Sequence, residues 1–328
     1  DDSAKALRYY EEALRLDDRN SSAYAGRGQA FDESGQEDKA KADYLKALSI
    51  DPDLNQVKAP LGIIYYQDGE IAEAEKYMEA ALAVSADNAE TQYFLGLIRY
   101  KQGRDNEAEA ALRRSIEIDG DNDDAHYFLG MVLIRLGKEK EGTEALERAT
   151  QIDPKYVQAW FDLGVAYYNQ ESFLRSIVAF KKAIQFNSNK TDELKTVYME
   201  SYANLAEAYR QVDDIDQAIA NYRIAVSRIT NDAELQTNYG FVLGRKERWK
   251  PAIESFKKAA IIQPDAISYA NLGWAYYNLA MYDKGFNHPR SRIEESLRMA
   301  KPALAKSVEF DPDFIAAQLN LGVVLNDL

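Results

Sequence analysis

Cysteine is missing from this sequence of 328 residues, and histidine occurs only twice. Without thiols the chain forms no disulfide and offers no thiolate to a zinc ion. The two histidines, His126 and His288, lie far apart, and neither stands in an HExxH motif. The residues therefore predict no transition-metal site, and we expect His126 to pack in a core position.

Long apolar runs and positive charge are also scarce. No stretch reaches the roughly 18 consecutive apolar residues that indicate a membrane-spanning helix. The 54 acidic residues outnumber the 40 basic ones, for a net charge of -14. Because a negative field repels phosphate backbones and anionic lipids, we expect no nucleic-acid partner and no membrane insertion within this chain.

Catalytic and cofactor-binding motifs are absent as well. The nucleotide-binding patterns GxxxxGK(S/T) and GxGxxG and the hydrolase pattern GxSxG do not occur. The acidic run from Asp119 begins like a calcium loop, but Asp124 stands where the loop needs glycine and Gly130 where it needs glutamate. The sequence therefore predicts no enzyme activity, no cofactor and no metal site.

Glycine, in contrast, recurs at a fixed interval of 34 residues. Such self-similarity indicates an array of structural repeats. One unit of this length is too short to bury a core by itself, so stacked neighbours must supply a continuous one. The glycines that mark the period are Gly28, Gly62, Gly96, Gly130 and Gly164.

The unit of residues 157–190 contains two apolar stripes at helical spacing. The first has members at i, i+3, i+4 and i+7, and the second follows a short polar turn. Two antiparallel helices per unit is the direct interpretation. A glycine inside a helix costs about 1 kcal/mol, so its recurrence indicates close helix approach. The stripes consist of Trp160, Leu163, Gly164 and Tyr167, then Ser176, Phe180, Ala183 and Ile184.

These residues resemble the tetratricopeptide repeat, whose pattern is a large aromatic, Leu-Gly, Tyr, Ala, an aromatic, Ala and a closing Pro. Other units supply further members of the pattern, such as Tyr44, Pro52, Phe256 and Pro264. The resemblance covers nearly the whole chain. It implies an all-α fold, a right-handed α-α superhelix of helix-turn-helix repeats that forms a single domain over residues 1–328.

The repeat count is interrupted twice. Full repeats are expected to start near residues 21, 55, 89, 123, 157, 199, 233 and 266, with half repeats at 1–20 and 315–328, so both ends look cut. Insertions are expected near 191–198, as a longer first helix capped by Thr191, and near 281–297, as a loop before a longer second helix. Pro60 and Pro302 should kink their helices. The loop of residues 286–290 either contacts a partner or is only a longer turn.

Asparagine dominates one surface position in the later repeats. Numbering each unit from its first residue places position 6 opposite the core stripe, on the face that lines the concave groove in this family. An asparagine amide can pair with both the C=O and the N–H of an extended peptide, as in the asparagine ladders of peptide-binding family members. The alternative is a solvated helix face. The predicted ladder consists of Asn204, Asn238, Asn271 and Asn320.

Aromatic residues occupy positions 5 and 6 of three earlier units. Exposed aromatic side chains on a soluble protein mark an interaction surface, but the same residues could instead be core between repeats. Charged residues at positions 2 and 13 would rim the groove, and the Lys and Asn residues of the carboxylate clamp of chaperone-binding members are missing. The aromatic candidates are Tyr93, Phe94, Tyr127, Phe128 and Phe161.

These patterns predict a soluble, non-catalytic scaffold that binds an extended segment of a partner protein or peptide in its concave groove. Two alternatives are a self-assembling oligomeric platform and the regulatory region of a larger protein. A cytoplasmic location is expected, or a periplasmic one if an export signal lies outside this chain. The partner itself is not encoded in the pattern.

Overall fold

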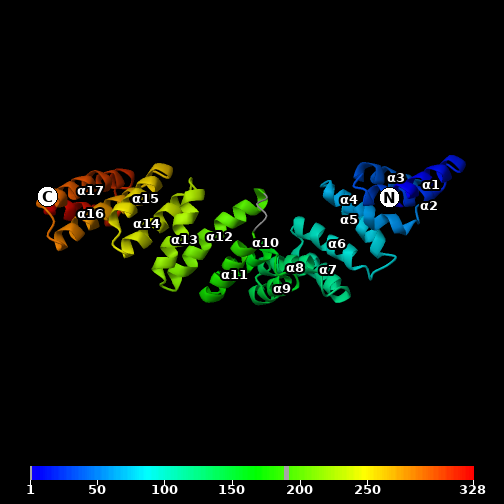
Figure 1. Ribbon diagram of the computed structural model, residues 1–328, viewed down its shortest axis with the longest axis horizontal. Coiled ribbons are helices and arrows are strands. Elements are labelled where there is room, and N and C mark those ends of the chain that lie inside the picture. The colour runs from blue at the N-terminus through cyan, green and yellow to red at the C-terminus, as the bar shows by residue number, and fades with distance from the viewer. Residues whose placement is uncertain (1, 188–191) are drawn as a thin grey trace. The chain divides into compact units, whose positions relative to one another are not determined.

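The computed structural model describes residues 2–187 and 192–328, and these residues form helices joined by turns, with no strand among them. Within each of the two compact units that the chain forms, every helix packs against the next one, which is the consequence of two apolar stripes separated by a short turn (Figure 1). The predicted all-α class is therefore confirmed. None of the described helices is long and apolar enough to cross a bilayer.

The chain divides into two compact units, residues 1–155 and 156–328. The predicted single domain stays a prediction. Unit 1 begins with one helix and continues with four hairpins, α2–α3 to α8–α9. Its helices are α1 (Asp2–Leu16), α2 (Ser21–Glu33), α3 (Glu37–Ile50), the 3-10 turn η1 (Asn55–Val57), α4 (Lys58–Gln67), α5 (Ile71–Leu82), α6 (Ala89–Lys101), α7 (Asp105–Ile118), α8 (Asp123–Arg135) and α9 (Glu139–Ile152).

Unit 2 contains four hairpins, α10–α11 to α16–α17, and one further helix. Two of its hairpins have lengthened helices, since α12, α16 and α17 have 20, 20 and 21 residues where the others have 13 or 14. The helices are α10 (Val157–Asn169), α11 (Phe173–Phe186), α12 (Asp192–Gln211), α13 (Ile215–Arg228), α14 (Ala233–Arg245), α15 (Trp249–Ile262), α16 (Ala266–Gly285), α17 (Arg290–Phe310) and α18 (Ile315–Asp327).

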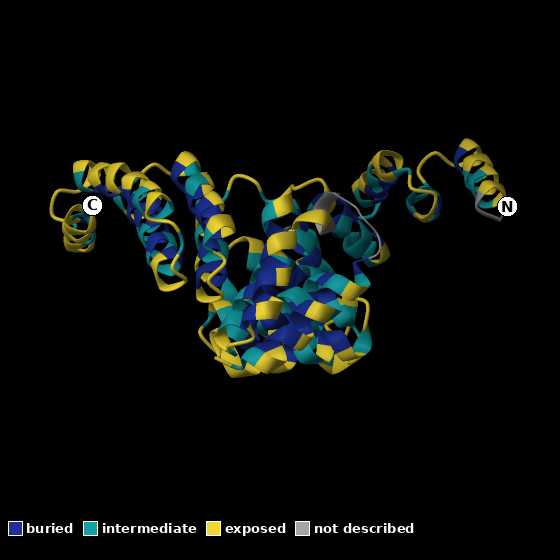
Figure 2. Ribbon diagram, turned by 60° about the vertical axis from the view of Figure 1, so that its left-hand side comes forward, coloured by how far each residue is buried: buried dark blue, intermediate teal, exposed yellow. Residues whose placement is uncertain are grey.

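The recurring glycine sits where the two helices of a hairpin touch. A Cβ atom on Gly164 would lie 2.6 Å from the ring of Phe180, and one on Gly96 would lie 2.6 Å from Leu112. Ser176 Oγ adds a hydrogen bond of 2.8 Å to the carbonyl oxygen of Gly164. Buried residues accordingly lie on the parts of the helices that face a paired helix (Figure 2). The glycine thus permits the contact that closes each hairpin.

The turn inside each hairpin uses a left-handed residue, and the two units differ in its identity. Unit 1 has glycine at this point of every hairpin, with φ from 71° to 79°, whereas unit 2 has larger residues with φ from 53° to 63°. Only glycine adopts this conformation without a steric cost. The unit 1 residues are Gly35, Gly69, Gly103 and Gly137, and those of unit 2 are Glu171, Asp213, Glu247 and Asn287.

Ion pairs link successive hairpins of unit 1. Arg104 Nη1 lies 2.5 Å from Glu75 Oε1, and Lys138 Nζ lies 2.7 Å from Glu109 Oε2. Both cations stand just before the second helix of a hairpin, and both carboxylates lie 29 residues earlier in the chain. The repeat period therefore brings equivalent charges together, although ion pairs near the protein surface contribute only about 0.2–1 kcal/mol each.

Four expectations about the irregular segments need correction or restriction. Pro60 does not interrupt a helix, because α4 starts at Lys58 and a residue in the first turn has no N–H bond to lose. The insertion near 281–297 lengthens the first helix as well, since α16 continues to Gly285 beyond the expected start of the loop. Pro302 lies inside the uninterrupted helix α17. The predicted cap Thr191 lies outside the described residues.

Candidate functional site

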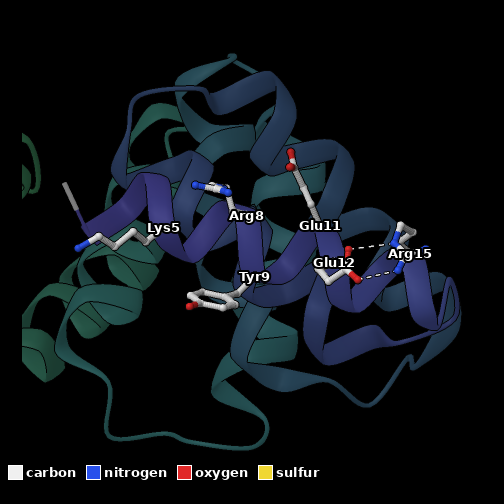
Figure 3. A pocket seen from close by; sticks show the side chains of 6 residues that line it. All are labelled: Lys5, Arg8, Tyr9, Glu11, Glu12 and Arg15. Atoms are coloured by element: carbon white, nitrogen blue, oxygen red, sulfur yellow. Dashed lines mark hydrogen bonds and ion pairs between the residues drawn. The ribbon is translucent and has the colours of Figure 1, made fainter.

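A hollow of about 590 Å³ beside α1 does not form a converging site. All six residues that line it come from this one helix (Figure 3). Glu12 and Arg15 neutralise each other through two hydrogen bonds of 2.7 and 2.9 Å. Because no second element contributes a side chain, the hollow offers no combination of groups that could grip a ligand.

A cavity of about 460 Å³ in unit 2 has a different composition. It lies along the first helices α10, α12 and α14 and reaches Tyr222 of α13. Two members of the predicted ladder, Asn204 and Asn238, line it together. The remaining lining residues are Tyr168, Ala203, Glu207, Arg210, Tyr222, Asp232, Glu234 and Leu235.

Glu207 is the centre of a hydrogen-bond network in this cavity. Its carboxylate accepts hydrogen bonds from the hydroxyls of Tyr222, at 2.6 Å, and of Tyr168, at 3.0 Å. Arg210 Nε donates to the same group at 2.8 Å, and Gln211 Nε2 donates at 2.9 Å. The donors come from α10, α12 and α13, so one carboxylate ties two neighbouring hairpins together.

The network keeps Glu207 ionised and its two tyrosines protonated. Burial opposes ionisation, but hydrogen bonds from Arg210 and Tyr222 outweigh it and lower the pKa of Glu207 to about 2. Burial, reinforced by the hydrogen bond to Glu207, raises the pKa of Tyr222, and burial raises the pKa of Tyr168. Glu207 is therefore a fixed negative charge in the cavity, and the tyrosine hydroxyls around it already donate their hydrogen bonds to it.

The amides of Asn204 and Asn238 remain available. Both side chains are half-buried, and neither makes a side-chain hydrogen bond to any residue that the structure describes. Each amide carries two N–H donors and one acceptor oxygen. The two amides therefore present unused donors and acceptors on α12 and α14, beside the network of Glu207.

The structure unites only half of the predicted ladder in this cavity. Asn271 lies on α16 and Asn320 on α18, and neither lines the same hollow. Both are half-buried, as are Asn204 and Asn238. Position 6 is thus partly exposed in all four repeats, so each asparagine lies at the edge of the packed core and also faces solvent.

The aromatic candidates contact each other and their neighbours. The ring of Phe94 lies 5.2 Å from that of Tyr93 and 5.6 Å from that of Tyr66, and the ring of Phe128 lies 5.0 Å from that of Tyr127. Tyr93 and Phe128 pack against the unit 1 core, and Tyr127 is buried.

The fifth aromatic candidate belongs to the other unit. Phe161 lies on α10 and packs against Phe180 with ring centroids 5.8 Å apart. The five rings therefore do not gather in one described hollow. Some of their contacts join rings within a repeat and others cross to a neighbouring hairpin, as Phe94 does to Tyr66, and these contacts are of the kind expected for packing.

The charged residues predicted to rim the groove are unevenly neutralised. Arg135 pairs with Asp105, and Arg245 pairs with Asp213 at 2.5 Å, so these predicted rim cations bind carboxylates of the preceding hairpin. Glu234 lines the cavity without an ion pair to any described residue. The rim of the unit 2 cavity is consequently acidic.

Sequence reasoning missed Glu207, although a signal was present. Glu207 stands at position 9, where three other units carry Leu97, Met131 and Val165. A carboxylate at a position that is otherwise apolar, with Arg210 three residues later on the same helix face, indicates a buried polar network. Its two tyrosine partners lie 39 and 15 residues away and could not be paired with it from the sequence.

Three family models match parts of the chain. A tetratricopeptide repeat model matches residues 21–54 and 200–231, and a second one matches residues 129–190. The model of the anaphase-promoting complex, cyclosome, subunit 3 matches residues 67–149. No curated protein sequence matches this chain.

Solved structures with the same arrangement of helices are distant in sequence. One is the C-terminal part of a TPR repeat-containing protein from Cytophaga hutchinsonii (14% identity, 79% of this chain, 98% of that chain, TM-score 0.57). Another is YrrB, a TPR protein with an unusual peptide-binding site (22% identity, 60% and 98%, TM-score 0.51). A third is a chain of the APC/C hetero-tetramer Cut9–Hcn1 (21% identity, 83% and 52%, TM-score 0.50). At these identities the likeness shows the fold.

Proposed function

Because this chain belongs to the tetratricopeptide repeat family, whose fold serves protein interaction, we propose that it is a non-catalytic scaffold that binds an extended peptide segment of a partner protein. The observation that carries the proposal is the pair of free amides, Asn204 and Asn238, in one cavity of unit 2. Asn271 and Asn320 on α16 and α18 would continue the ladder along the partner.

The cavity is organised before a ligand arrives. Glu207 accepts from residues on three helices, so the surface between α12 and α14 loses little freedom on binding. A preorganised surface improves affinity because less side-chain entropy is lost. Each amide contact adds about 0.5–1.5 kcal/mol, so the asparagines alone support binding of modest affinity.

The charge of the cavity defines the kind of segment that it accepts. Glu207, Asp232 and Glu234 are acidic, and Arg210 is the one cation among the residues that line it. A partner segment with lysine or arginine would therefore be favoured over an acidic one. We assign the five aromatic candidates to packing rather than to the ligand, since each ring contacts another aromatic ring, either of a second candidate or, for Phe161, of Phe180.

Fluorescence anisotropy with labelled peptide pools tests this proposal. The pools hold twelve-residue extended peptides that carry lysine, glutamate or only neutral residues. The parent chain should bind the lysine pool most tightly, and Asn204→Ala with Asn238→Ala should weaken that binding about tenfold. The control pair Asn106→Ala and Asn326→Ala removes two exposed amides outside the cavity and should leave affinity unchanged.

Two results would contradict the proposal. One is equal binding by both pairs of variants, and the other is an absence of binding to all three pools. Sedimentation of the parent chain over a range of concentrations tests the alternative of a self-assembling platform, since only that alternative requires a mass that rises with concentration.

A further inference from the structure

A second hollow, of about 270 Å³, lies at the turns of unit 2 rather than along its first helices. Residues from the turn between α14 and α15 form one side, and the end of α16 and the start of α17 form the other. Three cations and three apolar side chains dominate its lining: Arg248, Lys250, Arg292, Trp249, Leu279 and Tyr282. It shares no residue with the cavity around Glu207.

The cations Arg248 and Lys250 are exposed and make no ion pair with any described residue. Arg248 occupies the position at which Arg104 and Lys138 are neutralised by carboxylates 29 residues earlier. The residue 29 places before Arg248 is Ile219, which is buried and apolar. Arg248 therefore lacks the carboxylate that neutralises Arg104 and Lys138 at the equivalent position of unit 1.

Arg292 is held in place by a buried acid. Asp283 is fully buried, and its Oδ2 lies 2.8 Å from Arg292 Nε while its Oδ1 lies 2.7 Å from His288 Nδ1. The Arg292 side chain is 40% exposed, so part of the guanidinium remains accessible at the hollow. The extra turns of α16 and α17 create this arrangement, because all three residues lie in the lengthened part of the hairpin.

Aromatic surface accompanies these charges. Trp249 is half-exposed and packs edge-on against Trp274, with ring centroids 5.4 Å apart. The ring centroids of Tyr282 and Phe286 lie 4.7 Å apart, and Phe286 is 62% exposed at the tip of the hairpin. Exposed aromatic side chains next to arginine are the residue types that carry most of the energy at protein interfaces.

We propose that this hollow is a second docking site, which takes an acidic peptide segment carrying a large apolar residue. The segment's carboxylates would meet Arg248, Lys250 and Arg292, and its apolar side chain would cover Trp249, Leu279 and Tyr282. Charge complementarity favours an acidic occupant. The hollow is lined by three cations and by a single acid, Glu247, although the chain as a whole has a net charge of -14. The site is independent of the asparagine ladder and attracts the opposite charge.

Intrinsic tryptophan fluorescence and labelled peptides test the site on the full chain. The probes are twelve-residue peptides with four glutamates around a central leucine, the same peptide with serine in place of leucine, and the same peptide with lysines in place of the glutamates. We expect the acidic leucine peptide to bind at least tenfold more tightly than either of the others. Binding should change the fluorescence, and Trp249→Phe should reduce that change.

A charge-matched pair of variants separates the site from general electrostatics. Arg248→Glu with Lys250→Glu should weaken binding of the acidic leucine peptide at least tenfold. Lys46→Glu with Lys140→Glu, two exposed cations of unit 1, should change it less than twofold. Circular dichroism verifies that all variants stay folded.

Three outcomes with the peptide probes would each overturn the proposal, and a fourth would come from inorganic polyphosphate as an additional probe. The first three are equal losses in both pairs of variants, equal binding of the leucine and serine peptides, and preference for the lysine peptide. Tighter binding of polyphosphate than of the acidic leucine peptide would also overturn it, since it would identify a site for phosphate. Asn204→Ala with Asn238→Ala should have no effect here, so this site and the ladder can fail separately.

Discussion

Glu207 shows at the scale of one residue how packing and binding share the same groups. Its pKa in the folded chain is about 2, against an ordinary value of 4.5. A lowered pKa stabilises the folded state fully above about pH 5, and this contribution is lost as the pH falls from 4.5 towards 2. We expect Glu207→Gln to lower the free energy of unfolding by on the order of 2 kcal/mol at pH 7 and by much less at pH 2.5.

Urea unfolding of parent and variant at several pH values measures this difference. Glu309→Gln, which changes an exposed carboxylate with no ion pair among the described residues, serves as the control and should have no such pH dependence. A loss in Glu207→Gln that is the same at pH 7 and pH 2.5 would show that shape, and not charge, accounts for it.

Gly164 permits close contact rather than flexibility. An added Cβ would lie 2.6 Å from Phe180, which is itself buried, so the ring would have to move. We expect Gly164→Ala to lower the free energy of unfolding by about 1–3 kcal/mol through overpacking. Gly120→Ala is the matched control, because a Cβ there would meet only the carbonyl oxygen of Ile116, at an ordinary contact distance of 3.7 Å, so thermal unfolding should rank the two variants clearly.

At the scale of one hairpin, the left-handed residue in the turn between the two helices affects the free energy of unfolding. Glu171 has a φ of 56°, where a side chain costs energy, whereas Gly103 fills the equivalent place in unit 1 with a φ of 74°. We expect Glu171→Gly to raise the free energy of unfolding by about 0.5–1 kcal/mol, because relief of strain exceeds the entropy lost by glycine. Gly103→Ala should lower it by about 1 kcal/mol. Chemical unfolding checks both signs, and a loss in both variants would contradict the argument.

The hairpins could be predicted from the sequence, and the polar network could not. Every contact that defines a hairpin involves residues within one 34-residue period, such as Gly164 and Phe180, so a local pattern reveals it. The bond from Tyr168 to Glu207 crosses between hairpins, and no periodicity identifies such a pair. The lengthening of α16 was missed because Gly285 signals a turn while Asp283, two residues earlier, is still fixed inside the helix.

At the scale of the whole molecule, the repeated register in unit 1 has a consequence for length. Gly96 meets Leu112 as Gly130 meets Leu146, and Gly103 and Gly137 have φ values of 74° and 75°. Removal of residues 105–138 would join the turn after α6 directly to α9. Gly96 would then face Leu146, which is the same pair of residue types as before.

The shortened chain would also keep its charges in order. Arg104 would precede α9 in place of Lys138 and would retain its partner Glu75. We expect this deletion to give a folded, helical protein of lower thermal stability, because one stacking interface is lost. Removal of residues 105–121 alone, half of that length, would place two first helices side by side and should prevent folding, as circular dichroism would show. Unit 1 can therefore change size only in whole steps of its period, and that property would let an engineer adjust the span of the scaffold without redesigning a single contact.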